Sequence, residues 1–353
     1  MRSLHATLAT LSSVAAVVLA VACGNDRGGF EDNPGTNGTD PEGGAPSLGG
    51  DTDGGGKGTI CSSDLHSVLD DKGVVVKQCT DDQGCAGGQC IPACNAAGES
   101  HGTVGCDYVV STPSFLPSIA PPCFAVFLAN NWGKPAKVTV TRDGTSYDVT
   151  KFGRIPVAGQ AESAWQPVPA TGIPPGQVGV LFMSSDPNSA NGASPLHCPI
   201  TPALNASSAV SATGKGKAWH ITTDFPVTAY DILPYGGAKS FLPSAELVIP
   251  TTAWGTNYFG IVPRRGTSAP QWGQIVASKD GTQVQIVPNV ALPGGAGVAV
   301  APQNQVTTYT LNAGEYVQWQ ESGEMSSTVI SANAPIAFVG GQGYLCYSSK
   351  TST

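Results

Sequence analysis

The stretch HITTDFPVTAYD, residues 220–231, returns further along the chain as VISANAPIAFVG, residues 329–340. In both stretches an Ile is followed by Thr or Ser, then by Asp or Asn, and then by Pro and a branched aliphatic residue. Proline donates no backbone hydrogen bond and fixes its φ, so sheets tolerate it at the first residue of a strand. Each stretch therefore predicts a strand, a tight corner and a second strand that begins at Pro226 or Pro335.

The corner residues and the upstream turn signals extend the similarity. Asp224 and Asn333 precede the two prolines, and such side chains hydrogen-bond nearby backbone groups in turns. An Asp-Gly-Thr turn signal comes before each stretch, at residues 143–145 and 280–282. The pattern predicts two related β-lobes. Chance similarity is the alternative, because Ile, Thr, Pro and Val are common in β proteins and the spacing of the matching segments is uneven.

Alternating apolar and polar residues predict short strands, and hairpins between them, through the rest of the body. The clearest runs are AKVTVTRDGTSYDVT at 136–150, KDGTQVQIVP at 279–288 and YTLNAGEYVQWQ at 309–320. We predict an all-β fold with two β-sandwich-like lobes, at about 106–235 and 236–353. The first lobe contains an extra segment, residues 184–210, that we expect to hang outside it.

The N-terminus is typical of an export signal. Residues 1–22 contain Arg2 and then the short apolar run VAAVVLAVA, and Cys23 follows directly. The end of this run resembles a bacterial lipobox, which predicts that Cys23 is lipidated and anchors the protein to the membrane. A signal peptide that is cleaved without lipidation is the alternative. Residues 23–60 are rich in Gly, Asp and Pro, which predicts a disordered tether.

Nine cysteines follow Cys23, and in an exported chain such density favours disulfide bonds. Five of them lie in residues 61–105, where the composition is too polar for a core, so we predict a small disulfide-stapled knot that includes a hairpin with Gly73 in its turn. A zinc site is the alternative, but no Cys-x-x-Cys pair is present. The disulfide candidates are Cys61, Cys79, Cys85, Cys90, Cys94, Cys106, Cys123, Cys198 and Cys346.

Composition and motifs argue against several kinds of function. The net charge is -8 and no Lys/Arg cluster is present, so we expect no nucleic-acid partner. No catalytic or metal-binding motif is found, so we expect no catalytic residue, metal or cofactor. The best candidate for a ligand contact is the aromatic, Gly-punctuated stretch TTAWGTNYFG at 251–260, which we place in a loop between the lobes. Its candidate ligand-facing residues are Trp254, Asn257 and Tyr258.

Several phrases, in this order, resemble one known family. They are DQGCAGGQCIPAC at 82–94, VGCDY at 104–108, CFAVFLANNWGKPAKVTV at 123–140, AWHITTDFPVTAYDILPYGGAKSFLPSAELVIPTTAWGTNYFGI at 218–261, VASKDGTQVQIVP at 276–288, LNAGEYVQWQ at 311–320 and ISANAPIAFVGG at 330–341. Together they resemble the N-terminal domain of the IgGFc-binding protein family, in its bacterial lipoprotein form. The resemblance covers roughly residues 106–346 and implies a β-rich extracellular domain for binding and adhesion. Relatives usually continue into a further cysteine-bearing segment, which implies that Cys346 lacks its usual partner here.

These observations predict a non-catalytic lipoprotein on the outer surface of a bacterial cell envelope, with a β-rich domain that binds a protein or a glycan. The membrane would be reached through the lipid anchor alone. Two alternatives remain open. One is an extracellular glycan-active hydrolase that uses loops near Trp254 and Asp231, and the other is a passive envelope scaffold.

Overall fold

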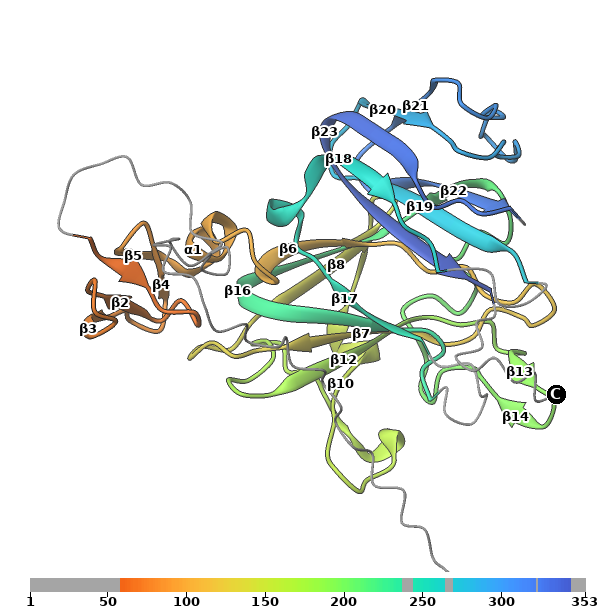
Figure 1. Ribbon diagram of the computed structural model, residues 1–353. Coiled ribbons are helices and arrows are strands. Elements are labelled where there is room, and N and C mark those ends of the chain that lie inside the picture. The colour runs from red at the N-terminus through yellow and green to blue at the C-terminus, as the bar shows by residue number, and fades with distance from the viewer. Residues whose placement is uncertain (1–57, 237–243, 264–268, 322, 344–353) are drawn as a thin grey trace, which may run out of the picture. The chain divides into compact units, whose positions relative to one another are not determined.

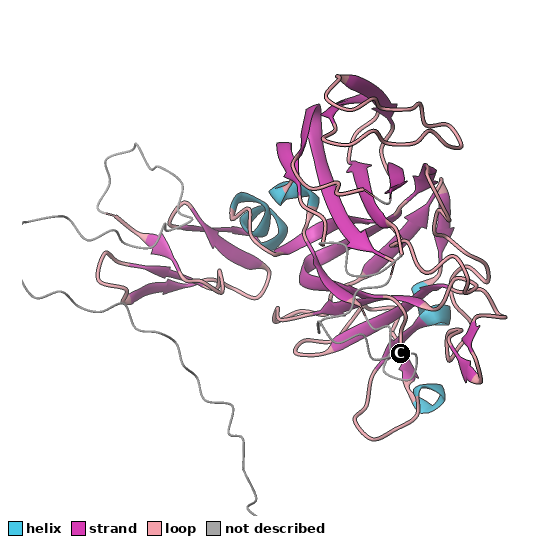
Figure 2. Ribbon diagram, turned by 45° about the vertical axis from the view of Figure 1, so that its right-hand side comes forward, coloured by secondary structure: helices cyan, strands magenta, loops and turns pink. Residues whose placement is uncertain are grey.

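The computed structural model describes residues 58–236, 244–263, 269–321 and 323–343. The predicted signal peptide, Cys23, nearly all of the tether and Cys346 lie outside these residues. Strands dominate the described chain (Figure 2), so the predicted all-β class is confirmed. No helix of the described segments has the length and apolar character needed to cross a bilayer.

Disulfides hold the small N-terminal unit together, because it buries few apolar side chains beyond Val68. The disulfide bonds Cys61–Cys85 and Cys79–Cys90 connect its two small sheets to each other. Gly73 adopts φ +78° in the turn of the predicted hairpin, which is confirmed. The unit consists of β1 (Ile60–Cys61), β2 (Ser67–Leu69), β3 (Val75–Gln78), β4 (Gln83–Ala86), β5 (Gln89–Pro92) and α1 (Ala93–Glu99).

A nine-stranded sheet forms the first lobe, in the order β11-β10-β12-β7-β16-β8-β9, with β6 and β17 also paired to β16 (Figure 1). Its strands are β6 (Val104–Val110), β7 (Phe124–Ala129), β8 (Val138–Arg142), β9 (Thr145–Tyr147), β10 (Gly153–Ile155), β11 (Gln166–Pro167), β12 (Val178–Ser184), β16 (Trp219–Ile232) and β17 (Ala245–Val248). The sheet carries one large apolar core, to which Trp219, Phe124 and Ile221 contribute. Around it lie α2 (Val149–Phe152), η1 (Glu162–Ala164), β13 (Ala190–Asn191) and β14 (Ser194–Pro195).

A seven-stranded sheet with its own core forms the second lobe, in the order β15-β22-β19-β23-β20-β21, with β18 paired to β23. Its strands are β15 (Gly214–Lys217), β18 (Gly255–Gly260), β19 (Gln271–Ala277), β20 (Thr282–Val287), β21 (Thr307–Leu311), β22 (Glu315–Glu321) and β23 (Thr328–Gln342). The two lobes exchange strands across the expected boundary at 235/236. β15 comes from the first half of the chain and pairs with β22, whereas β17 comes from the second half and pairs with β16.

The two sheets repeat one strand order. The series β12-β7-β16-β8-β9 in the first lobe corresponds to β22-β19-β23-β20-β21 in the second. β6 pairs with both halves of β16, and β18 pairs in the same way with β23. Along the chain the matching strands also occur in the same sequence, so each lobe contains one copy of a six-stranded unit.

The prediction that Pro226 and Pro335 begin new strands is wrong. β16 and β23 run continuously through the prolines. Each strand bends there at a register shift and changes partners, β16 from β8 to β7 and β23 from β20 to β19. A bulge tolerates proline because the bulged residue makes no ladder hydrogen bond, so a corner does not require a break in the strand.

The two acidic or amide residues at these bends occupy matching places. The Asp224 side chain accepts a hydrogen bond from the Lys137 backbone N–H at 2.6 Å. The Asn333 side chain accepts one from the Gln283 backbone N–H at 2.8 Å. Lys137 directly precedes β8, the strand that β16 leaves at its bend. Gln283 lies in β20, the strand that β23 leaves. The side chain thus ends the ladder in both lobes.

Three further expectations are corrected. The Asp-Gly turn at 143–144 joins β8 to β9, but the one at 280–281 joins β19 to β20, so the two turns are not equivalent. Residues 309–320 are no hairpin, because β21 pairs with β20 and β22 pairs with β19. The segment 184–210 does not hang outside: Cys198 is bonded to Cys123, and Ala203 N–H bonds the Phe182 carbonyl of β12.

Candidate functional site

The stretch 251–260 is an edge element of the second sheet, not the predicted loop between lobes. It forms η3 (Thr251–Ala253) and then β18, which pairs only with β23. Trp254 is half-buried, and its indole N–H donates to the Ile249 carbonyl at 3.0 Å. Asn257 is exposed. The three predicted ligand-facing residues therefore lie on one edge strand or beside it.

Tyr258 faces the interior of the second lobe. Its hydroxyl donates to the Ile336 carbonyl at 2.8 Å and accepts from the Gly255 N–H at 2.7 Å. Ile336 directly follows Pro335, so this hydroxyl binds the bend of β23. Strand register places Tyr258 opposite Ile330. These contacts give Tyr258 a structural role at the bend.

Tyr108 makes the same contacts in the first lobe. It lies opposite Ile221 on β16, and its hydroxyl donates to the carbonyl of Val227, the residue after Pro226. The Gly105 backbone N–H donates to the same hydroxyl, and burial is the larger effect and raises the pKa of Tyr108. Gly105 and Tyr108 thus correspond to Gly255 and Tyr258. The residues GCDY at 105–108 and GTNY at 255–258 are the sequence signal of this equivalence.

The outer face of β18 presents apolar side chains to solvent. Asn257 and Phe259 lie on this face, and Ile261 continues the alternation directly after the strand ends. Phe259 is 72% exposed and Ile261 75% exposed. Val329 lies opposite Phe259 on β23 and is 44% exposed. We call Phe259, Ile261 and Val329 the β18 strip. Sequence reasoning missed all three, although strand alternation through 255–261 separates them from the inward Tyr258.

Part of the corresponding face of the first lobe is covered by the second lobe. By register Val109 corresponds to Phe259, and Val109 is buried in a cluster with Val276 and Tyr316. Ser111 corresponds to Ile261, and its hydroxyl donates to the Gln274 side chain at 2.6 Å. The part of this face that carries Val109 and Ser111 is thus buried between the lobes, whereas its counterpart in the second lobe, with Phe259 and Ile261, is open.

Buried glutamines carry most of the polar contact between the lobes. The Gln274 amide donates to the Thr112 carbonyl at 2.9 Å and to the Gln318 side chain at 2.8 Å. The Gln318 amide donates to the carbonyls of Val210 and Ala212. Burial against this contact also raises the pKa of Tyr316 to about 12.

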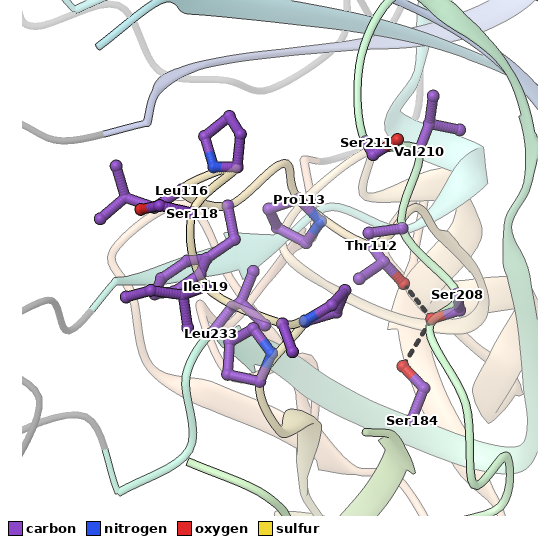
Figure 3. Close-up of a pocket in the computed structure, with 16 residues that line it drawn as sticks. Thr112, Pro113, Leu116, Ser118, Ile119, Ser184, Ser208, Val210, Ser211 and Leu233 are labelled. Carbon is purple, nitrogen blue, oxygen red and sulfur yellow. Dashed lines mark hydrogen bonds between the residues drawn. The ribbon is translucent and has the colours of Figure 1, made fainter. Parts of the chain in front are cut away.

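A cavity of about 190 Å³ lies beside this contact (Figure 3). Part of its polar wall is already satisfied, because the hydroxyls of Thr112 and Ser184 both hydrogen-bond the Ser208 hydroxyl, at 2.7 and 2.5 Å. The rest of the wall is mainly apolar, from Pro113, Phe115, Leu116, Pro117, Ile119, Pro121, Pro122, Val210 and Leu233. It offers no charged group for a substrate.

A pair of carboxyl groups lies inside the first lobe. Asp231 and Glu246 are register partners on β16 and β17, and Asp231 is buried beside core residues of the same strand. Burial raises the pKa of both groups, and the neighbouring Glu246 raises that of Asp231 further. The sequence could not reveal this pair, because it depends on the β16–β17 register.

The exposed histidine of β16 also has a carboxylate partner. His220 Nε2 lies 2.7 Å from the Asp107 carboxylate, and this hydrogen bond raises the pKa of His220. Asp107 and His220 correspond by register to Asn257 and Val329, so the second lobe has no such pair at this place. Within the described residues, no group of three His, Cys, Asp or Glu side chains is arranged to hold a metal ion.

Comparison with known proteins gives one match. No curated protein and no solved structure matches the chain significantly. One segment of the chain matches a family model. This segment starts just before β17 and contains β18 to β23, and therefore the whole β18 strip. Residues 244–353 match the model of the family described as IgGFc binding protein.

Proposed function

We propose that this protein is an exported, non-catalytic binding protein, held at the outer surface of a bacterial cell envelope, and that it binds a protein ligand through the β18 strip. The exposure of Phe259 on β18 and of Ile261 directly after it is the observation that carries the proposal. Neighbouring exposed apolar side chains mark interaction sites in folded proteins. The strip also lies within the segment that matches a family described as binding a protein.

The chemistry of the described residues supports display rather than turnover. The close carboxyl pair, Asp231 and Glu246, lies in the first lobe, and Asp231 is sealed in its core. Four disulfides brace the chain, which suits an oxidising compartment outside the cytoplasm. No observation favours the glycan-active alternative.

Lipidation of Cys23 is the proposed anchor, and the Gly-rich residues after it would serve as a spacer. Replacing Cys23 by Ala should abolish labelling of the protein with a radioactive fatty acid, and globomycin, which blocks cleavage of lipidated precursors, should make an uncleaved precursor accumulate in the membrane fraction. A Cys23→Ala variant that is labelled as strongly as the parent would rule out this anchor.

Site-specific photo-crosslinking tests the binding surface. A benzoylphenylalanine at position 259 should give protein adducts on intact cells, while the same probe at Val306, which is exposed outside the strip, should give none. Immunoglobulin Fc is the first purified probe, because of the description of the matched family. Equal crosslinking at both positions, or none at 259 with any protein, would contradict the proposed surface.

A further inference from the structure

The contact between the lobes shows what the face of β18 is built to meet. In the first lobe this face carries Val109 and Ser111, and it rests on Val276, Tyr316 and Gln274 of the second lobe. In the second lobe the same face carries Phe259 and Ile261 and meets nothing in the described chain. We therefore expect the partner of this open face to present a surface that corresponds to the one formed by Val276, Tyr316 and Gln274.

The first lobe contains such a surface. The registers of β7 with β16 and β12, compared with those of β19 with β23 and β22, match Val276 with Ala129, Tyr316 with Val178 and Gln274 with Phe127. All three first-lobe residues are partly exposed.

This surface extends as an apolar row over three strands. Tyr230 lies opposite Phe127 on one side and Leu247 on the other, so the three side chains share one face. Tyr230 is 45% exposed and Leu247 39% exposed. We call Phe127, Tyr230 and Leu247 the β16 row.

The contact within the molecule and the proposed contact between two copies differ in polarity on both sides. Within the molecule, Ser111 meets Gln274 through a hydrogen bond. In the corresponding contact between two copies, Ile261 would meet Phe127, and an apolar residue replaces a polar one on both sides. The free energy falls when apolar side chains leave water together, so Ile261 and Phe127 are complementary to each other, as the hydrogen-bonded Ser111 and Gln274 are.

We propose that the β18 strip of one molecule docks on a second copy of this chain, on the surface formed by Ala129, Val178 and Phe127 together with the adjoining β16 row. This contact would repeat between molecules the one that joins the lobes within a molecule. The inference rests on the proposed function and names the partner of the same strip. The two surfaces differ, so the interface is heterologous. It leaves one strip and one row free in every dimer, and the assembly grows head to tail.

Sedimentation velocity over a concentration series tests the proposal on the full chain carrying Cys23→Ala, so that the anchor plays no part. The parent should grow beyond a dimer as concentration rises. Phe259→Ser on the strip, and Tyr230→Ser with Leu247→Ser on the row, should each weaken association at least tenfold, while Val306→Ser should leave it unchanged. Circular dichroism checks that every variant folds, and Ile261→Ser replaces Phe259→Ser if that variant does not.

Mixing separates a head-to-tail contact from the other arrangements. The strip variant keeps its row and the row variant keeps its strip, so an equimolar mixture should form a heterodimer and stop there. A row variant that still dimerises by itself, while the parent forms only dimers, would show strip-on-strip pairing and overturn the proposal. A parent that is monomeric at all concentrations would overturn it too. Foreign-protein adducts at position 259 would then leave the proposed function standing.

Discussion

At the scale of single residues, the Asp231–Glu246 pair makes stability depend on pH. Both folded pKa values are raised, so the folded state holds protons that the unfolded chain releases near pH ~4. The contribution of the pair to the free energy of unfolding is therefore full below that pH and is lost as pH rises through the folded pKa values.

Replacing Asp231 by Asn should weaken this dependence, because the amide stays neutral at every pH and only the buried Glu246 keeps a raised pKa. The melting temperature of the variant should exceed that of the parent at pH 7 and match it near pH 4. Thermal unfolding followed by circular dichroism from pH 4 to 8 measures this. Asp71→Asn, at an exposed position of the knot, is the control and should follow the parent. An Asp231→Asn variant with the parent's pH slope would show that the pair does not titrate as described.

At the scale of elements, the bent strands β16 and β23 organise both lobes. Each changes partners at its proline, and a tyrosine from the neighbouring strand binds the carbonyl just beyond the bend. The bend thus gives one strand two sets of partners, and the tyrosine fixes where the change occurs.

The Tyr108→Phe substitution tests this role. It leaves the Val227 carbonyl and the Gly105 N–H without their partner in a buried place, which should cost about 1–3 kcal/mol in the free energy of unfolding. Urea denaturation measures the loss. Tyr230→Phe, on the exposed face of β16, should change stability by less than about 0.5 kcal/mol. Equal effects of the two changes would mean that the hydroxyl at the bend stabilises nothing.

Sequence patterns predicted the elements better than their connections. The all-β class and the Gly73 hairpin follow from alternation and turn residues, which are local signals. The continuity of β16 through Pro226 could not be read, because a bulge and a strand end have the same local sequence. The inward turn of Tyr258 was missed for a similar reason: both faces of β18 carry aromatic residues, and only the position of the core tells them apart.

At the scale of the molecule, two copies of one unit are joined by a polar contact. Gln274 and Gln318 are fully buried in it and satisfy backbone groups from the first half of the chain. Such a network couples the lobes only while every member is paired. No local pattern indicates the burial of these glutamines, since glutamines on a strand are equally typical of a solvent-facing side.

The Gln274→Ala substitution should uncouple the lobes. It leaves the Ser111 hydroxyl, the Thr112 carbonyl and the side-chain oxygen of Gln318 without the partner that Gln274 gives each of them, which should cost about 2–4 kcal/mol. Calorimetry should show the single transition of the parent broaden or split into two. Gln283→Ala, at an exposed position of β20, should leave the transition unchanged. A single unshifted transition in Gln274→Ala would place the coupling elsewhere.

The central claim is that one face of the repeated unit is covered in the first lobe and open in the second. Hydroxyl-radical footprinting of dilute protein, with each side chain referred to the same residue in the unfolded chain, tests it most directly. The account predicts oxidation of Phe259 and Ile261 close to the unfolded level, and strong protection of Val109. Equal protection of Phe259 and Val109, or an unprotected Val109, would contradict it.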